Sequence, residues 1–227
     1  MAINMETLKT RALTAVVFVA VMLTGLLWNH WSFIALFTIV HFGCWYEFIK
    51  LMRLIYGNRY VKYCLLGVLY ITMPILMLVS LRLLDIFGNS GIIKADMGYI
   101  LPCTIIFSIW INDTMAYLVG SIIGKTPFSK ISPKKTWEGT GGGAILCVII
   151  IGLAAYFYLG DYKQAAIIAA ICAIFGTMGD LLESKLKRMA NVKDSGSLMP
   201  GHGGFLDRFD SLLVAVPFVW LYVKLIS

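Results

Sequence analysis

Charged side chains are scarce in this sequence, because Asp, Glu, Lys and Arg together make up only 14% of its 227 residues. A typical soluble domain is roughly a quarter charged. Hydrophobic residues make up 59% of the chain, and the mean hydropathy is +0.83. This composition excludes a soluble globular protein and predicts an integral membrane protein.

Several motif classes are also missing. The sequence has no CxxC pair, no HExxH motif and no Cys/His cluster with the spacing of a zinc site. It has no GxSxG motif, Ser-His-Asp order or Cys-His pair that would indicate a covalent nucleophile. Disulfide scaffolds, zinc enzymes and nucleophilic hydrolases are therefore disfavoured. The five cysteines are interpreted as small buried apolar residues; they are Cys44, Cys64, Cys103, Cys147 and Cys172.

Apolar runs, by contrast, are abundant, and seven of them approach the ~20 residues that a membrane-crossing helix needs. We therefore expect an all-α polytopic membrane protein with about seven transmembrane helices. The first run is interpreted as a retained span, because no small-x-small cleavage site follows it. The runs cover residues 12–28, 33–49, 63–84, 98–122, 141–159, 164–179 and 211–226.

Positive charge is distributed unevenly between the loops that join these runs. Loops on the side of the N-terminus hold 15 of the 19 Lys and Arg residues. Because cytoplasmic loops carry the excess of Lys and Arg, we expect the N-terminus and the functional loops in the cytoplasm and the C-terminus outside. The net charge of +7 follows from the same loops, so no nucleic-acid partner is expected. With no repeat or linker, residues 1–227 form one domain, with N-terminal spans in 1–97 and the functional half in 98–227.

One polar segment, residues 184–210, lies between two strongly apolar runs and concentrates charge there without a structural need. Its cations can hold phosphates, and its carboxylates suit Mg²⁺, which prefers oxygen ligands and often shares them with substrate phosphates. Its glycines let the backbone approach a ligand closely. The charged residues are Lys185, Lys187, Arg188, Lys193, Asp194, Asp207, Arg208 and Asp210. The segment predicts a phosphate-and-metal site at a membrane surface.

Acidic residues at helix spacing stand before and at the end of this segment. Asp180 precedes Glu183 and Ser184 by three and four residues, which places them on one helix face. Asp207 and Asp210 are likewise three residues apart at the start of the last run. Two alternatives to a functional site stay open: these acids lie at solvated helix ends, or they interact favourably with the dipole of a helix N-terminus. Asp180 lies nearer to the membrane and is the better candidate for a metal ligand.

Other polar positions are ambiguous. Residues 132–139, SPKKTWEG, are either a basic membrane-surface loop anchored by Trp137 or an anion-binding loop. Asp113 ends the fourth run, and an ionisable residue at membrane depth indicates a functional site. Glu47 and His41, inside the second run, are interpreted as satisfied interior groups.

Two stretches of the sequence combine glycine with residues that can bind phosphate. Residues 120–126 are similar to a phosphate-binding P-loop, but Val119 stands where the motif needs its first glycine, and an apolar run rather than a strand precedes it. We therefore reject a P-loop. Residues 201–204, GHGG, favour a phosphate-facing turn. His202 could donate to a phosphate or only shape this turn, and both interpretations stay open.

The whole segment 184–210 resembles the signature of the phosphatidate cytidylyltransferases, the CDP-diacylglycerol synthases. The shared pattern is S-x-L-K-R-x4-K-D-S-G-x-L-x-P-G-H-G-G-x-x-D-R-x-D. Residues 112–117 and 132–139 also resemble family segments, in the same order. Met199 departs from the usual branched aliphatic residue. The resemblance implies a Mg²⁺-dependent reaction in which CTP and phosphatidate give CDP-diacylglycerol and pyrophosphate.

The resemblance also implies roles for individual residues. Asp180 and Asp207 would bind the metal, which is Mg²⁺ with a second, monovalent cation such as K⁺. Asp113 would support the site from the membrane side. Asp210 and Asp194 would support the metal ligands or bind the second cation. The residues assigned to catalysis are Lys193, Asp194, His202, Arg208 and Asp210. Those assigned to substrate binding are Ser132, Lys134, Lys135, Thr136, Ser184, Lys187, Arg188, Gly203 and Gly204.

The partners implied are CTP, phosphatidate, the lipid bilayer and a second copy in a homodimer, and the location implied is a bacterial plasma membrane. Alternatives are a cytidylyltransferase acting on an ether-lipid phosphate and a polyprenol kinase. A transporter for anions or phosphorylated lipids would place charge near mid-membrane, often in repeated halves, and neither feature is visible. A non-catalytic anchor for anionic lipids would need the cations but not the aspartates.

Overall fold

The computed structural model describes residues 5–83, 98–196 and 203–226, and this part of the chain is almost entirely helical. Apart from an isolated bridge between Pro127 and Thr136 and a single bridge residue at Gly203, the described residues contain no β-structure. In chain order the elements are α1 (Met5–Leu27), α2 (His30–Tyr56), the 3₁₀ turn η1 (Gly57–Arg59), α3 (Tyr60–Gly67), the π-helical turn η2 (Val68–Thr72), α4 (Met73–Leu83), α5 (Ile100–Ile123), α6 (Trp137–Leu159), α7 (Lys163–Met189) and α8 (Leu206–Ile226).

Five helical stretches among the described residues are long and apolar enough to cross a membrane. They are His30–Leu83, Ile100–Ile123, Trp137–Leu159, Lys163–Met189 and Leu206–Ile226, with a shorter apolar helix at Ala12–Leu27. The prediction of an all-α polytopic membrane protein is therefore confirmed.

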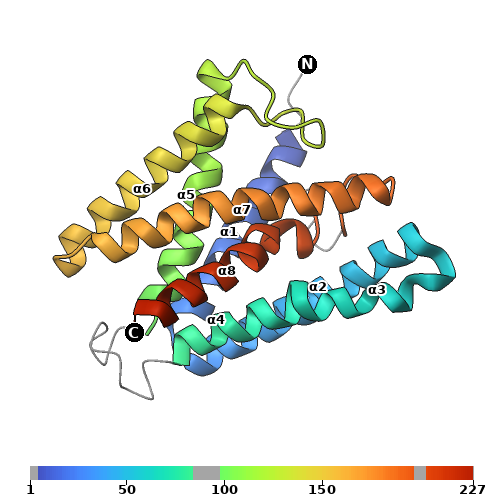
Figure 1. Ribbon diagram of the computed structural model, residues 1–227, viewed down its shortest axis with the longest axis horizontal. Helices are drawn as coiled ribbons and strands as arrows, with labels where there is room; N and C mark the ends of the chain where they lie inside the picture. The colour runs from blue at the N-terminus through green and yellow to red at the C-terminus, as the bar shows by residue number, and fades with distance from the viewer. Residues whose placement is uncertain (1–4, 84–97, 197–202, 227) are drawn as a thin grey trace.

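The first of these stretches is a hairpin. At ~1.5 Å per residue a straight helix of 54 residues would be far longer than the ~30 Å hydrocarbon core. Gly57, with φ of 55°, ends α2 and lets the chain reverse. Figure 1 shows α3 and α4 returning alongside α2. Each of the apolar runs in the sequence thus overlaps a helix.

Side chains at the helix ends explain where several helices begin. Asn29 accepts a hydrogen bond from the Ser32 backbone N–H at 2.8 Å, and the Ser32 hydroxyl accepts one from Asn29 N at 3.1 Å. This reciprocal pair is a capping box, which satisfies amides that the first turn of α2 leaves free. Thr136 caps α6 in the same sense, since its hydroxyl accepts from Gly139 N at 3.1 Å.

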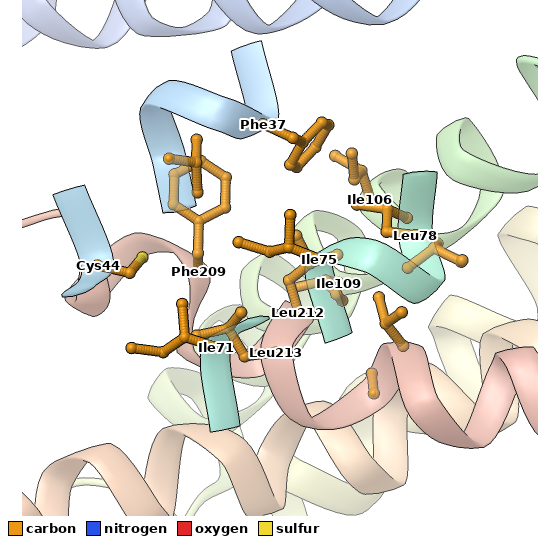
Figure 2. Close-up of a cluster of buried hydrophobic side chains, with 14 of the residues drawn as sticks. Phe37, Cys44, Ile71, Ile75, Leu78, Ile106, Ile109, Phe209, Leu212 and Leu213 are labelled. Carbon is orange, nitrogen blue, oxygen red and sulfur yellow. The ribbon is translucent and has the colours of Figure 1, made fainter. Parts of the chain in front are cut away.

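The main apolar core lies where α2, α4, α5 and α8 meet. Phe37 of α2, Ile75 of α4 and Ile106 of α5 point toward one another there, and Phe209 and Leu213 of α8 close the cluster from the other side (Figure 2). All of these side chains are buried. This cluster joins the N-terminal helices to the C-terminal half and packs against the first turns of α8.

Glycines let α5 and α6 pack with their backbones in close contact. A Cβ added at Gly143 of α6 would lie 2.6 Å from the backbone nitrogen of Ala116 in α5, and one at Gly139 would lie 2.8 Å from the Ala116 carbonyl oxygen. Small residues at such crossings drive helix association in membranes. The α6 glycines therefore serve helix packing, which fixes the position of the loop between α5 and α6.

The polar connections gather at one end of the helices. In Figure 1 the α2–α3 turn, the α5–α6 loop (residues 124–136) and the connection between α7 and α8 lie toward the same end as the N-terminus, and the C-terminus lies at the other. The polar loops predicted to be functional thus lie toward the same end of the structure.

We predict that Gly143→Ala lowers the thermal stability of the protein in detergent, because its methyl group would overlap the α5 backbone. Overpacking of this kind costs about 1–3 kcal/mol. Gly141→Ala in the same helix is the matched control, since nothing lies within 4 Å of a Cβ there. Thermal unfolding should show a lower midpoint for Gly143→Ala alone, and equal midpoints would refute the proposed contact.

Candidate functional site

A polar cavity of about 470 Å³ opens between α5, the α5–α6 loop, α6 and α7. It brings together several residues assigned to substrate or metal from the sequence. Asp113 contributes from α5 and Asp180 from α7, and the loop supplies two hydroxyls and two amines. The predicted residues that line it are Asp113, Ser132, Lys134, Lys135, Thr136 and Asp180.

An ion pair crosses this cavity. The Lys135 ammonium contacts the Asp180 carboxylate, and the two side chains remain 25% and 31% exposed. Ser184, one turn further along α7, donates a hydrogen bond to Asp180 Oδ1 at 3.2 Å. Because both charges are partly open to solvent, an anionic ligand can reach Lys135 and a cation can reach Asp180.

The α5–α6 loop is held in shape by a carboxylate of α6. Glu138 accepts hydrogen bonds from the backbone amides of Lys125 at 3.2 Å and Thr126 at 3.1 Å, and from the Thr126 hydroxyl at 2.8 Å. Phe128 N donates to the Lys135 carbonyl at 2.7 Å and closes the loop on itself. The fold of this loop therefore presents Lys134 and Lys135 on a fixed turn rather than on a loose segment.

The P-loop-like glycines have a packing role here. Gly120 lies within α5 and Gly124 directly follows it, so neither opens a strand-to-helix turn. A Cβ at Gly124 would lie 2.6 Å from the Thr136 hydroxyl oxygen, and one at Gly120 would lie 3.2 Å from it. The geometry agrees with the rejection of a P-loop.

A second charged cluster lies where the end of α7 meets the start of α8. The Lys187 ammonium lies 2.6 Å from Asp207 Oδ1 and 2.5 Å from Glu183 Oε2. Glu183 has no exposed side-chain surface, so Lys187 is the charge that compensates it. Lys187, which sequence analysis assigned to substrate phosphates, thus bridges two carboxylates in this structure.

Asp207 is surrounded by donors. Its Oδ2 accepts from Gly204 N at 2.8 Å and from Ser195 N at 2.9 Å, and the Ser195 hydroxyl oxygen lies 2.9 Å from it. Gly203 has φ of 81°, and a Cβ there would lie 2.8 Å from Asp207 Oδ2. Only glycine fits this left-handed position comfortably. The Gly204 backbone N–H therefore donates to Asp207, and Gly203 leaves room for the Asp207 carboxylate. The assignment of both glycines to substrate phosphates stays a prediction.

Asp210 is buried at the crossing of α7 and α8. It accepts a hydrogen bond from Ser211 N at 2.6 Å. Gly179 makes this crossing close, since a Cβ there would lie 3.0 Å from Ser211 Cα, and the next residue of α7 is Asp180. Asn112, which lines the cavity, is also buried, and its Oδ1 has no hydrogen-bond partner among the described residues. Asn112 thus offers a buried oxygen to the cavity, whereas the Asp210 carboxylate is buried beside it at the helix crossing and does not line it.

The remaining assigned residues lie outside these two clusters or outside the described structure. Arg188, Lys193, Asp194 and Arg208 are exposed, and their assigned roles remain predictions. His202 lies outside the described residues, so the choice between its two interpretations stays open.

The described residues contain no group of three or more His, Cys, Asp and Glu side chains arranged to hold a metal ion. Asp180 and Asp207 each contact a lysine instead. Mg²⁺ usually keeps several waters and takes one or two carboxylates together with substrate phosphates. The donor set therefore fits a metal that binds along with an anionic substrate, and it does not fit a cage built by the protein alone.

Three residues that shape the site were not assigned to it from the sequence. Ser195 contacts Asp207, Glu138 holds the α5–α6 loop, and Glu47 of α2 accepts hydrogen bonds from the chain just before α8. Glu47 was interpreted as a satisfied interior group, and its hydrogen bonds agree with that. The signal for Glu47 in the sequence was its charge inside an apolar run. Such a charge indicates a functional position, but it does not identify the residues that contact it.

Comparison with known proteins gives consistent results. The model of the cytidylyltransferase family matches residues 65–226. The chain is 39% identical over 173 residues to a phosphatidate cytidylyltransferase of Bacillus subtilis, covering 74% of this chain and 60% of that protein. It is 34% identical over 197 residues to one of Staphylococcus aureus, covering 78% of this chain and 70% of that protein. It is 46% identical over 115 residues to the chloroplastic phosphatidate cytidylyltransferase 4 of Arabidopsis thaliana, a match that covers 50% of this chain and 29% of that protein.

We predict that Lys187→Met destabilises the protein, because it leaves the buried Glu183 carboxylate without its cation. Removing one partner of a buried ion pair costs about 3–5 kcal/mol. The measurement is denaturant unfolding in detergent. Lys185→Met, at an exposed position on the same helix, should unfold like the wild type. Adding Glu183→Gln to Lys187→Met should restore part of the loss, and a failure to restore any would argue against the pairing.

Proposed function

The chain belongs to the cytidylyltransferase family, as its signature predicted, and from this we propose that it transfers the cytidylyl group of CTP to phosphatidate, giving CDP-diacylglycerol and pyrophosphate. The structural observation that carries the proposal is the polar cavity in which the two lysines of the α5–α6 loop face Asp113 and Asp180. It lies at the loop end of apolar helices, where a water-soluble nucleotide and a membrane lipid can meet.

The loop supplies the charge that two anionic reactants need. Lys134 and Lys135 would neutralise CTP phosphates or the lipid phosphate, and the hydroxyls of Ser132 and Thr136 would donate to the same oxygens. Because Lys135 contacts Asp180, a phosphate entering the cavity would exchange that contact for its own. Glu138 keeps the loop backbone in place during this exchange.

The reaction needs no protein nucleophile, in keeping with the missing nucleophile motifs. An oxygen of the phosphatidate phosphate forms a bond to the α-phosphorus of CTP, and the bond from that phosphorus to the bridging oxygen of the β-phosphate breaks. Pyrophosphate leaves with the bonding electrons. The protein contributes by aligning the two phosphates and by stabilising the charge that builds up on them.

A magnesium ion would supply further charge neutralisation on the phosphates. The residues that would hold it are Asp180 and Asp207, with Asp210 and Asp194 as second choices, and a monovalent cation such as K⁺ would share the site. Lys187 holds Asp207, and Ser184 orients Asp180, before any cation binds.

We also propose seven membrane crossings, with the site on the cytoplasmic side. The five apolar stretches include the hairpin of α2 with α3 and α4, which supplies two crossings, and α1 supplies another. The excess of Lys and Arg on the loops at the site end supports this orientation.

The reaction is tested with purified protein in lipid, using phosphatidate, Mg²⁺ and CTP labelled at the α-phosphate. We expect label in a CDP-lipid, equimolar pyrophosphate, and loss of both when metal is chelated. Label that stays in water as CDP would contradict cytidylyl transfer and indicate a lipid kinase. No CTP consumption with any phospholipid acceptor would contradict an enzyme altogether.

Variants then test the aspartates. Asp180→Asn and Asp207→Asn should each lower kcat by about 10²–10³-fold, the usual loss when charge aimed at the reacting groups is removed. Lys185→Met should retain the wild-type rate, because Lys185 is exposed on the same helix and has no assigned role. Rates near the wild type in both aspartate variants would remove the metal assignment.

The topology is tested by labelling single cysteines in intact cells. Cys44, Cys103, Cys147 and Cys172 are buried, so a Cys64→Ser background leaves few reactive thiols. Lys130→Cys in the α5–α6 loop should react with a membrane-impermeant maleimide only after permeabilisation, and Asp161→Cys between α6 and α7 should react without it. The reverse pattern would invert the proposed orientation.

A further inference from the structure

Glu47 is a buried carboxylate whose hydrogen bonds all reach across the molecule. It lies in α2, only 3% exposed. Its Oε1 accepts from Phe205 N at 2.9 Å, and its Oε2 accepts from Leu206 N at 2.9 Å and from the Ser195 hydroxyl at 2.6 Å. These donors belong to the two described ends of the connection between α7 and α8. One side chain of α2 therefore ties both ends together.

The connection is shaped around this carboxylate. A Cβ added at Gly196 or at Gly204 would overlap the Glu47 carboxylate, so both positions have room only for glycine. Gly43, one turn before Glu47 on α2, likewise has no room for a side chain because the Phe205 ring packs on it. The connection therefore packs closely against one full turn of α2, from Gly43 to Glu47.

Ser195 joins Glu47 to the candidate active site. Its hydroxyl oxygen lies 2.6 Å from Glu47 Oε2 and 2.9 Å from Asp207 Oδ2, and its backbone N–H donates to the same Asp207 oxygen. Gly204, next to the Glu47-bound amide of Phe205, donates to Asp207 as well. Two of the donors that orient Asp207 are thus held in place by Glu47.

The backbone amides of Phe205 and Leu206, at the N-terminal end of α8, also depend on Glu47. Phe205 and Leu206 lie at the start of α8, where backbone N–H groups have no partner within the helix. Glu47 satisfies them with a negative charge from another helix, at the end of α8 that favours an anion. The carboxylate therefore sets where α8 begins and how Asp207, in its first turn, faces Lys187.

We propose that Glu47 is a positioning residue for cytidylyl transfer: from α2 it anchors the chain on both sides of the α7–α8 connection and thereby fixes Asp207 and its donors. The inference rests on the proposed function. Among the described residues, no hydrogen bond joins Glu47 to a residue that lines the cavity between α5, α6 and α7, so its effect falls on the alignment of reacting groups and not on nucleotide affinity. A displacement of about 1 Å in such groups lowers turnover by about 10²-fold.

The test variant is Glu47→Gln, which keeps the side-chain shape but replaces one acceptor oxygen with an NH₂ donor. We expect kcat to fall about 10–100-fold while the KM for CTP changes less than about threefold. Amide hydrogen exchange at Phe205 and Leu206 should accelerate about tenfold or more, with exchange in α5 and α6 unchanged. Asp161→Asn is the matched control, since this exposed carboxylate between α6 and α7 accepts only from Lys163 N among the described hydrogen bonds.

Ser195→Ala provides a second route that does not depend on how well Glu47→Gln folds. It removes only the hydroxyl that contacts both carboxylates, and it should lower kcat in the same selective way. In the double variant the two losses should be less than additive, because both act through one contact.

The outcomes separate the two proposals. A wild-type kcat in Glu47→Gln, or a rise in KM with unchanged kcat, would overturn the positioning role. Additive losses in the double variant would also overturn it, because Glu47 and Ser195 would then act independently. If the wild type transferred no cytidylyl group, the proposed function would fail, while the exchange rates at Phe205 and Leu206 would still decide whether Glu47 anchors the segment.

Discussion

The need to satisfy buried carboxylates governs this structure. A charge removed from water is tolerated only when it is paired or hydrogen-bonded, and in an apolar helical protein few partners are available. Glu183 takes the Lys187 ammonium, Asp207 takes the same ammonium together with amides before α8, and Glu47 takes amides and a hydroxyl from that segment. The Glu183 contact lies within α7, whereas the contacts of Asp207 and Glu47 join distant parts of the chain, so polar groups that would be costly alone instead define one arrangement of the helix ends.

Two glutamates hold the two polar loops in a comparable way. Glu138 binds the amides at the start of the α5–α6 loop, and Glu47 binds those at the start of α8. The first comes from the helix that follows its loop, whereas the second comes from a helix some 150 residues away in the chain. Close backbone packing at glycines, between α5 and α6 and between α7 and α8, keeps both loops at the same end of the molecule.

The lysines of the site contact carboxylates. Lys135 pairs with Asp180 and Lys187 pairs with Asp207. Such pairs keep the groups near the positions that the proposed reaction uses, and they also balance charge until phosphates and a cation take over the partners. The Lys135 pair is partly exposed and suited to exchange, while Lys187 is bound to a fully buried glutamate and is suited to remain in place.

The sequence by itself determined the class of protein, the approximate helices and the family, because apolar runs and a long charged signature are local patterns that need no knowledge of the fold. It also gave the cavity residues Asp113, Lys135 and Asp180 as candidates, since charge near a membrane run is conspicuous. Only the tertiary structure decided that Lys187 binds carboxylates and that Glu47 meets Ser195 across 148 positions of the chain. Those contacts arise from how helices pack, and hydrogen-bond partners so far apart in sequence leave no periodicity or spacing from which they could be inferred.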